Sequence, residues 1–73
     1  MQNEINLTLR NQTGNMERVL QVIRYRGFGI HSMTANYHDD AIHFQCQVHS
    51  QKPVSNLLKQ LEKLPSVLAL QHN

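Results

Sequence analysis

A chain of 73 residues has room for one domain, over residues 1–73, and leaves none for a second. Hydrophobic residues make up 40% of the sequence and charged residues 16%, a balance that disfavours disorder. The net charge of +2 comes without a long run of basic residues, which disfavours a nucleic-acid surface. Because so small a domain buries only roughly 60% of its unfolded surface, we expect a partner to complete its core.

The first third of the chain predicts a strand and a helix. Residues 5–9 alternate apolar and polar side chains, the pattern of a half-buried strand. Turn-forming residues follow at 11–15. Apolar residues then recur at i, i+3, i+4 and i+7 from Met16, which predicts a helix that ends at Gly27.

The rest of the chain predicts three strands and a second helix. In the strand expected over 28–37, the apolar positions change parity between Ile30 and Met33, which indicates a bulge or a strand apolar on both faces. A turn at 38–41 leads into the clearest alternation in the sequence, over 42–48. Pro53 fits the first turn of a helix whose apolar face covers 54–64, Pro65 ends it, and 67–71 form a last strand.

This order of elements predicts an α+β fold of the ferredoxin-like βαββαβ type. Two helices would cover one face of a four-stranded antiparallel sheet. The N-terminal residues lack the features of a signal peptide, and the longest apolar run, 67–70, is far short of the roughly 20 residues of a membrane span. We therefore expect a cytoplasmic protein that makes no membrane contact.

No residue stands in a context that predicts catalysis. Cys46, the single cysteine, excludes an internal disulfide and a multi-cysteine zinc site, and its inward position predicts a small buried hydrophobe. Asp39 and Asp40 are adjacent in a turn, where their side chains diverge into solvent. The sequence therefore predicts no catalytic residue.

Five histidines raise the question of a metal site. His43 and His49 share a strand face but lie about 20 Å apart, too far for one ion. His31, His38 and His72 have no paired spacing. We therefore expect outward-facing polar histidines and no bound metal.

One short match points to RNA. Residues 26–30, RGFGI, match the opening of the RNA-recognition signature, whose domain shares the βαββαβ order. The match fails at Ile30, His31 and Met33, and the segment follows the first helix, whereas the signature belongs on the third strand. An RNA-binding domain is therefore the least favoured alternative.

The loop 11–15 has two interpretations. It precedes a helix, where free backbone N–H groups and the helix dipole favour an anion. Gly14 would admit a ligand close to the backbone, and Asn11 offers both a donor and an acceptor, as a free amino acid requires. On spacing alone, a turn that caps the helix is favoured.

A resemblance to a known family bears on that choice. Residues 9–14 (LRNQTG) with Arg18 and Val19, together with residues 26–34 (RGFGIHSMT), resemble the ACT domain of acetohydroxyacid (acetolactate) synthase small subunits. Residues 59–64 (KQLEKL) are similar to the second helix of that family. The similarity covers nearly the whole chain. In its short length the chain resembles the single-domain, isozyme II-like small subunits.

The resemblance implies a non-catalytic role in branched-chain amino acid biosynthesis. The chain would be a regulatory subunit that holds no cofactor and activates a separate catalytic large subunit. Thiamine diphosphate, Mg and FAD are expected in that large subunit. The alternative that stays open is a stand-alone amino-acid-binding ACT module that regulates another enzyme.

The resemblance also implies a homodimer and an effector site. ACT domains pair through their second strands, and the matching positions here are Phe28, Ile30, Met33, Ala35 and Tyr37. Valine, leucine or isoleucine would bind at that interface, and the matching positions are Asn11, Gly14, Asn15, Met16, Gly29 and Ile30. Feedback-sensitive relatives tend to have Asn where this chain has Gly29, so we expect weak binding.

Overall fold

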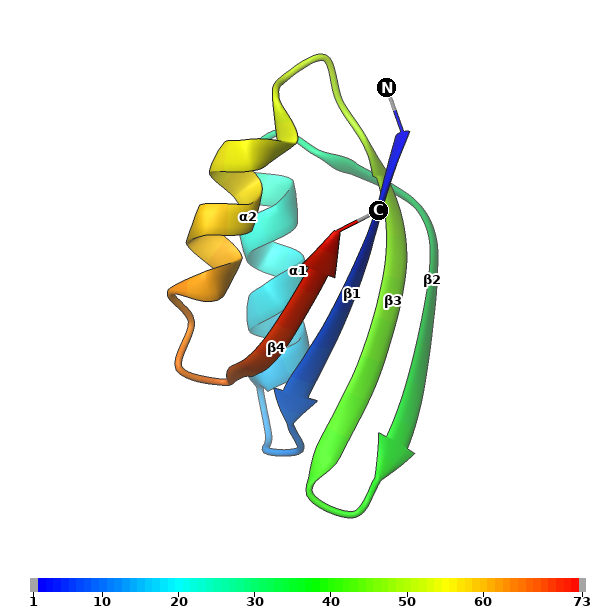
Figure 1. Ribbon diagram of the computed structural model, residues 1–73, viewed down its shortest axis with the longest axis vertical. Coiled ribbons are helices and arrows are strands. Elements are labelled where there is room, and N and C mark those ends of the chain that lie inside the picture. The colour runs from blue at the N-terminus through cyan, green and yellow to red at the C-terminus, as the bar shows by residue number, and fades with distance from the viewer. Residues whose placement is uncertain (1, 73) are drawn as a thin grey trace.

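Four strands form one antiparallel sheet in the computed structural model, which describes residues 2–72 (Figure 1). In chain order the elements are β1 (Gln2–Arg10), α1 (Asn15–Tyr25), β2 (Gly29–His38), β3 (Ala41–His49), α2 (Val54–Glu62) and β4 (Val67–His72). The strands lie in the order β2-β3-β1-β4, and both helices cover the same face of the sheet (Figure 1). The predicted ferredoxin-like fold is confirmed.

Alternation along the two central strands builds the core. The inward residues of β1 lie opposite inward residues of β3, as in the pair Leu7 and Phe44, so both strands present one apolar face to the helices. The buried residues are Ile5, Leu7, Leu9, Val19, Ile23, Phe28, Ile42, Phe44, Cys46, Val48, Leu57 and Leu61. Cys46 is thus a buried hydrophobe, as its position in the alternation predicts.

A glycine ends α1 as the sequence predicts. Gly27 has a φ of 86°, in the left-handed region that glycine adopts without strain. Its N–H donates to the Arg24 carbonyl at 3.0 Å, and the Phe28 N–H donates to the Ile23 carbonyl at 3.1 Å. These bonds turn the chain so that Phe28 enters the core beside Ile23.

That turn places one predicted interface residue, Phe28, in the core. Phe28 is buried within the protomer and precedes β2, which begins at Gly29. Its side chain therefore belongs to the core and not to an exposed strand edge. The sequence pattern placed it in the strand because an aromatic residue after a glycine also fits a strand start.

A bulge in β2 explains the change of parity in its apolar residues. The register shifts between Ile30, opposite Val48, and Ser32, opposite Gln47. Met33 then lies opposite Cys46. Beyond the shift, the apolar positions of β2 pair with inward residues of β3, so they face the helix side of the sheet.

The second helix is shorter than its apolar pattern predicts. Pro53 is the N-cap of α2 and not a residue of its first turn, and the helix ends at Glu62. The Leu64 N–H donates to the Leu61 carbonyl at 3.1 Å, so a tight turn keeps Leu64 against the core. Pro65 follows that turn and prevents further helix.

Candidate functional site

The loop between β1 and α1 is bound to the β2–β3 hairpin through Asn11. The Asn11 backbone N–H donates to the Asp40 carbonyl at 2.8 Å, and its side-chain Nδ2 donates to the Asp39 carbonyl at 3.2 Å. Asp39 has a φ of 47°, as a tight hairpin turn requires. With Nδ2 engaged, the amide oxygen is the part of the Asn11 side chain that can accept a further hydrogen bond.

Gly14 begins α1 without a side-chain cap. It is the N-cap residue, with a φ of 88°, and no side chain hydrogen-bonds to the helix start. A Cβ at this position would meet no atom within 4 Å, so the space above Gly14 is open. Glycine is favoured here because of the positive φ and not because a side chain would clash. Residues 11–15 thus form a turn that begins the helix with a glycine N-cap and no side-chain cap.

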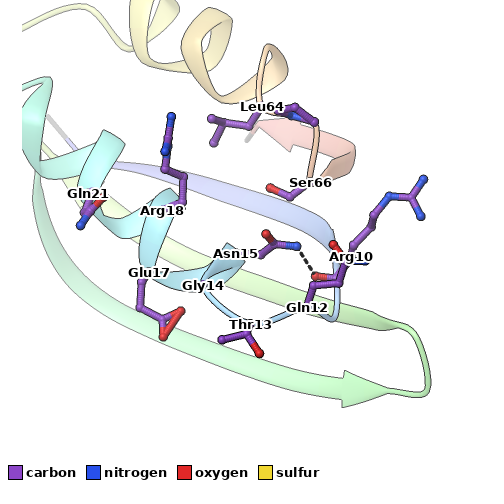
Figure 2. A pocket seen from close by; sticks show the side chains of 11 residues that line it. Arg10, Gln12, Thr13, Gly14, Asn15, Glu17, Arg18, Gln21, Leu64 and Ser66 are labelled. Carbon is purple, nitrogen blue, oxygen red and sulfur yellow. Dashed lines mark hydrogen bonds between the residues drawn. The ribbon is translucent and has the colours of Figure 1, made fainter.

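Asn15 holds the loop together. Its backbone N–H donates to the Gln12 carbonyl at 3.2 Å. Its side-chain Nδ2 donates to the Arg10 carbonyl at 3.0 Å, the bond drawn in Figure 2. The prediction placed the Asn15 backbone against a ligand, but these bonds fix the loop conformation, so Asn15 positions the loop.

An open hollow of about 790 Å³ lies over this loop and the start of α1 (Figure 2). Arg10, Gly14 and Arg18 are among its lining residues, and the loop from Leu64 to Ser66 closes one side. Met16 does not line it and packs against the core. The helix start turns the Met16 side chain inward, and its role at a dimer interface stays a prediction.

The start of β2 carries a feature that the sequence analysis missed. Gly29 lies opposite His49 on β3, and a Cβ built on Gly29 would lie 2.6 Å from His49 Nε2. The imidazole of His49 thus fills the space that a side chain at position 29 would need. The signal was the hairpin register, which places residue 49 opposite residue 29 once the bulge is counted.

The two parts of the predicted effector site lie at opposite ends of the sheet. Arg10, beside the loop, pairs with Ala41, whereas Gly29 pairs with His49 at the other end of β3. These ends are about 27 Å apart at 3.4 Å per residue. Within one protomer, the structure therefore brings Asn11, Gly14 and Asn15 together, and separately Gly29 and Ile30, but not the two groups.

β2 is an edge strand with exposed apolar side chains. It pairs with β3 on one side only and contains no Pro or Lys over its ten residues. Met33 is 49% exposed and Tyr37 is 62% exposed. Ala35, which lies between them, and Ile30, near the start of the strand, are half-buried. Such an edge is ready to pair with another strand.

Other reactive side chains form no site. Burial raises the pKa of Cys46 from 9.0 to about 11, so its thiol stays protonated near neutral pH. His38 and His43 make an edge-to-face contact with ring centroids 5.2 Å apart, and His72 Nε2 lies 3.0 Å from Asn3 Oδ1. Within residues 2–72, no three His, Cys, Asp or Glu residues are placed to hold a metal ion.

Neither helix within residues 2–72 has the length and apolar character that crossing a bilayer requires.

Comparison with known proteins identifies the family. A family model described as the ACT domain matches residues 11–70. The chain belongs to the ACT-domain family. It is 39% identical over 69 residues to the acetolactate synthase isozyme 2 small subunit of Escherichia coli K12, an alignment that covers 92% of this chain and 79% of that protein. The resemblance to small subunits of the single-domain type is thus confirmed.

Solved ACT structures share the fold. The ACT domain from GTP pyrophosphokinase of Chlorobium tepidum superposes with a TM-score of 0.87 at 15% identity, covering 100% of this chain and 97% of that one. The acetolactate synthase small subunit from Thermotoga maritima gives a TM-score of 0.82 at 23% identity, with 99% of this chain and 47% of that one covered. At these identities the likeness concerns the fold.

Proposed function

We propose that this ACT domain is the regulatory small subunit of an acetolactate synthase and activates a separate catalytic large subunit. The observation that carries the proposal is the 39% identity, along 92% of the chain, to a protein of that name. Thiamine diphosphate, Mg and FAD would then belong to the large subunit.

The exposed edge of β2 supports a homodimer. Antiparallel pairing of two copies of β2 about a two-fold axis puts Gly29 of one copy beside the end of the partner's β2. In that partner, Asn11 is bound to Asp39 and Asp40, directly after the strand. The loop and Gly29 then lie three strand spacings apart, about 14 Å, instead of about 27 Å within one protomer.

A branched-chain amino acid is the effector that suits such an interface. The amide oxygen of Asn11 would accept from the ammonium, and the uncapped start of α1 beside Gly14 would take the carboxylate. Ile30 of the partner would line the apolar side. Binding is expected to be weak, because Gly29 offers no side-chain amide and the His49 imidazole occupies its place.

The test combines copurification with an activity assay. The chain is mixed with its cognate catalytic subunit, the complex is isolated by gel filtration, and acetolactate formation is followed with and without the chain. We expect coelution and a higher rate, and no activity from the chain alone. Coelution with an unchanged rate would contradict activation. Failure to coelute would favour an ACT module that serves another enzyme.

A further inference from the structure

A groove of about 740 Å³ runs between α1 and α2, on a surface that shares no residue with the β2 edge. Four of the seven Lys and Arg residues of the chain line it. They are Arg18, Arg24, Arg26 and Lys63. No acidic residue lies among the lining residues, so the groove is cationic along its length.

The hollow at the start of α1 extends this positive surface. Both depressions include Arg18 and Leu64 in their lining, and the hollow adds Arg10. Its one acidic residue is Glu17. Figure 2 shows Arg18 projecting from α1 towards the side of Leu64, whereas Glu17 points the other way. A ligand that follows the groove therefore meets positive charge from one end to the other.

Apolar groups accompany the charge. Val22 and Leu64 are half-buried and pack against the core, so they present aliphatic surface in the groove. Tyr25 is 86% exposed, and the guanidinium of Arg26 lies 5.9 Å from its ring centroid. Exposed tyrosine beside arginine is typical of the residues that dominate protein–protein binding energy.

We propose that this groove docks an acidic segment of the catalytic subunit, an inference that rests on the proposed function. Carboxylates of that segment would pair with Arg18 and Lys63, and an aliphatic side chain would lie over Val22 and Leu64 against the ring of Tyr25. This commits the groove to a protein and not a nucleic acid. A single aromatic ring and an aliphatic floor suit a peptide better than stacked bases. None of the residues that line the groove belongs to β2, so pairing of β2 with a second copy would use other residues.

Charge reversal at matched positions tests the groove. Lys63 lines it, whereas Lys59, one helical turn earlier and also exposed, does not. The holo catalytic subunit is titrated with the native chain, with the double variant Arg18→Glu/Lys63→Glu and with Lys59→Glu. We expect the double variant to raise the concentration for half-maximal activation at least about tenfold, because like charges then face each other. Lys59→Glu should shift it by less than about twofold.

Two further measurements test whether the groove binds the catalytic subunit. Raising the salt concentration should weaken activation by the native chain and strengthen activation by the double variant, since salt screens an attraction in the first case and a repulsion in the second. Tyr25→Ala removes no charge and tests the apolar contact, with an expected loss of about tenfold. It also serves as the test if circular dichroism shows that the double variant is unfolded.

Each outcome decides between the accounts. If the native chain neither binds nor activates the catalytic subunit, the proposed function fails and the groove loses its partner. If the native chain activates and the groove variants match Lys59→Glu, the groove proposal alone is overturned. The groove is a nucleic-acid surface if the native chain shifts a uridine 20-mer, the double variant abolishes that shift, and activation stays unchanged.

Discussion

The two edges of the sheet look alike in exposure and differ in organisation. Met33 on β2 is 49% exposed and Leu68 on β4 is 50% exposed. On β2, the bulge near Ile30 comes at the start of the strand, and the apolar residues after it share one face. On β4, Leu68 lies at the register shift, between Val67 and Ala69, so it has no partner residue on β1.

The two edge strands, β2 and β4, also differ in length and in their contacts with the neighbouring strand. β2 has ten residues with an open edge, whereas β4 has six. His72, at the end of β4, contacts the side chain of Asn3 on the neighbouring β1. Short and bulged edge strands resist pairing with other chains. The difference leads us to expect an interface at β2, where exposed apolar residues lie in line, and none at β4, where one stands alone.

The largest expected effect is on the dimer. Met33→Lys places a charge in the centre of the β2 edge, and we expect the dimer dissociation constant to rise at least about a hundredfold. Leu68→Lys makes the same change at equal exposure on β4 and should leave the dimer intact. Sedimentation velocity measures both. A native chain that stays a folded monomer at high micromolar concentration would contradict the proposed dimer.

Cys46 reports whether an edge variant dissociates or unfolds, since it lies opposite Met33. Burial raises its pKa from 9.0 to about 11, so iodoacetamide should alkylate the folded chain about a hundredfold more slowly than the unfolded chain at pH 8. Met33→Lys should keep that protection. Fast alkylation of Met33→Lys would mean that the variant is unfolded and not a folded monomer.

The same thiol predicts a pH dependence of stability. The unfolded thiol ionises above about pH 9 and the folded one only above about pH 11, so the unfolded state releases its proton first. The free energy of unfolding should therefore fall between pH 9 and 11. Urea titrations of the native chain and of Cys46→Ala check this, and the variant should lack that part of the pH dependence.

A smaller effect concerns the loop that the proposed dimer places near the β2 strand of the second copy. Gly14→Ala should cost about 1 kcal/mol of the free energy of unfolding, because its φ of 88° disfavours any side chain. Crowding plays no part, since the space above Gly14 is open. Thr13→Ala, one residue earlier and exposed, is the control. Equal urea midpoints for the two variants would contradict the backbone argument.

The smallest effect concerns the effector. Gly29→Asn alone should change valine binding little, because the new side chain meets the His49 imidazole. Combined with His49→Ala, which clears that space, the amide should tighten valine binding several-fold, as one added hydrogen bond predicts. Calorimetry of the native chain, both single variants and the double variant separates the two contributions. Tight binding to the native chain that these changes leave intact would show that position 29 does not set affinity.

The fold was predictable from sequence because its local signals agree. Alternation over 42–48, helical spacing from Met16 and the glycine at 27 each specify one element, and together they allow few arrangements. The errors lie where a signal has two meanings. Phe28 fits a strand start as well as a helix-ending turn, and Leu64 fits a helix face as well as the tight turn that follows.

The candidate site was predictable only in part. The loop with Asn11 and Gly14 is a local sequence feature, and the structure forms it as a unit. The role of Asn15 depends on where the Arg10 carbonyl points, which no spacing rule contains. His49 reaches Gly29 only through the register of β2 on β3, a non-local property. The groove between the helices likewise combines residues from 18–26 with residues from 60–64.

One assay tests the central claim, that the chain acts as a dimer that activates acetolactate synthase. The cognate catalytic subunit is titrated with the native chain, Leu68→Lys and Met33→Lys while acetolactate formation is followed. The account predicts that the native chain and Leu68→Lys raise the rate alike and that Met33→Lys, folded but monomeric, needs a far higher concentration. Equal activation by Met33→Lys, or no activation by a native chain that binds the catalytic subunit, would contradict it.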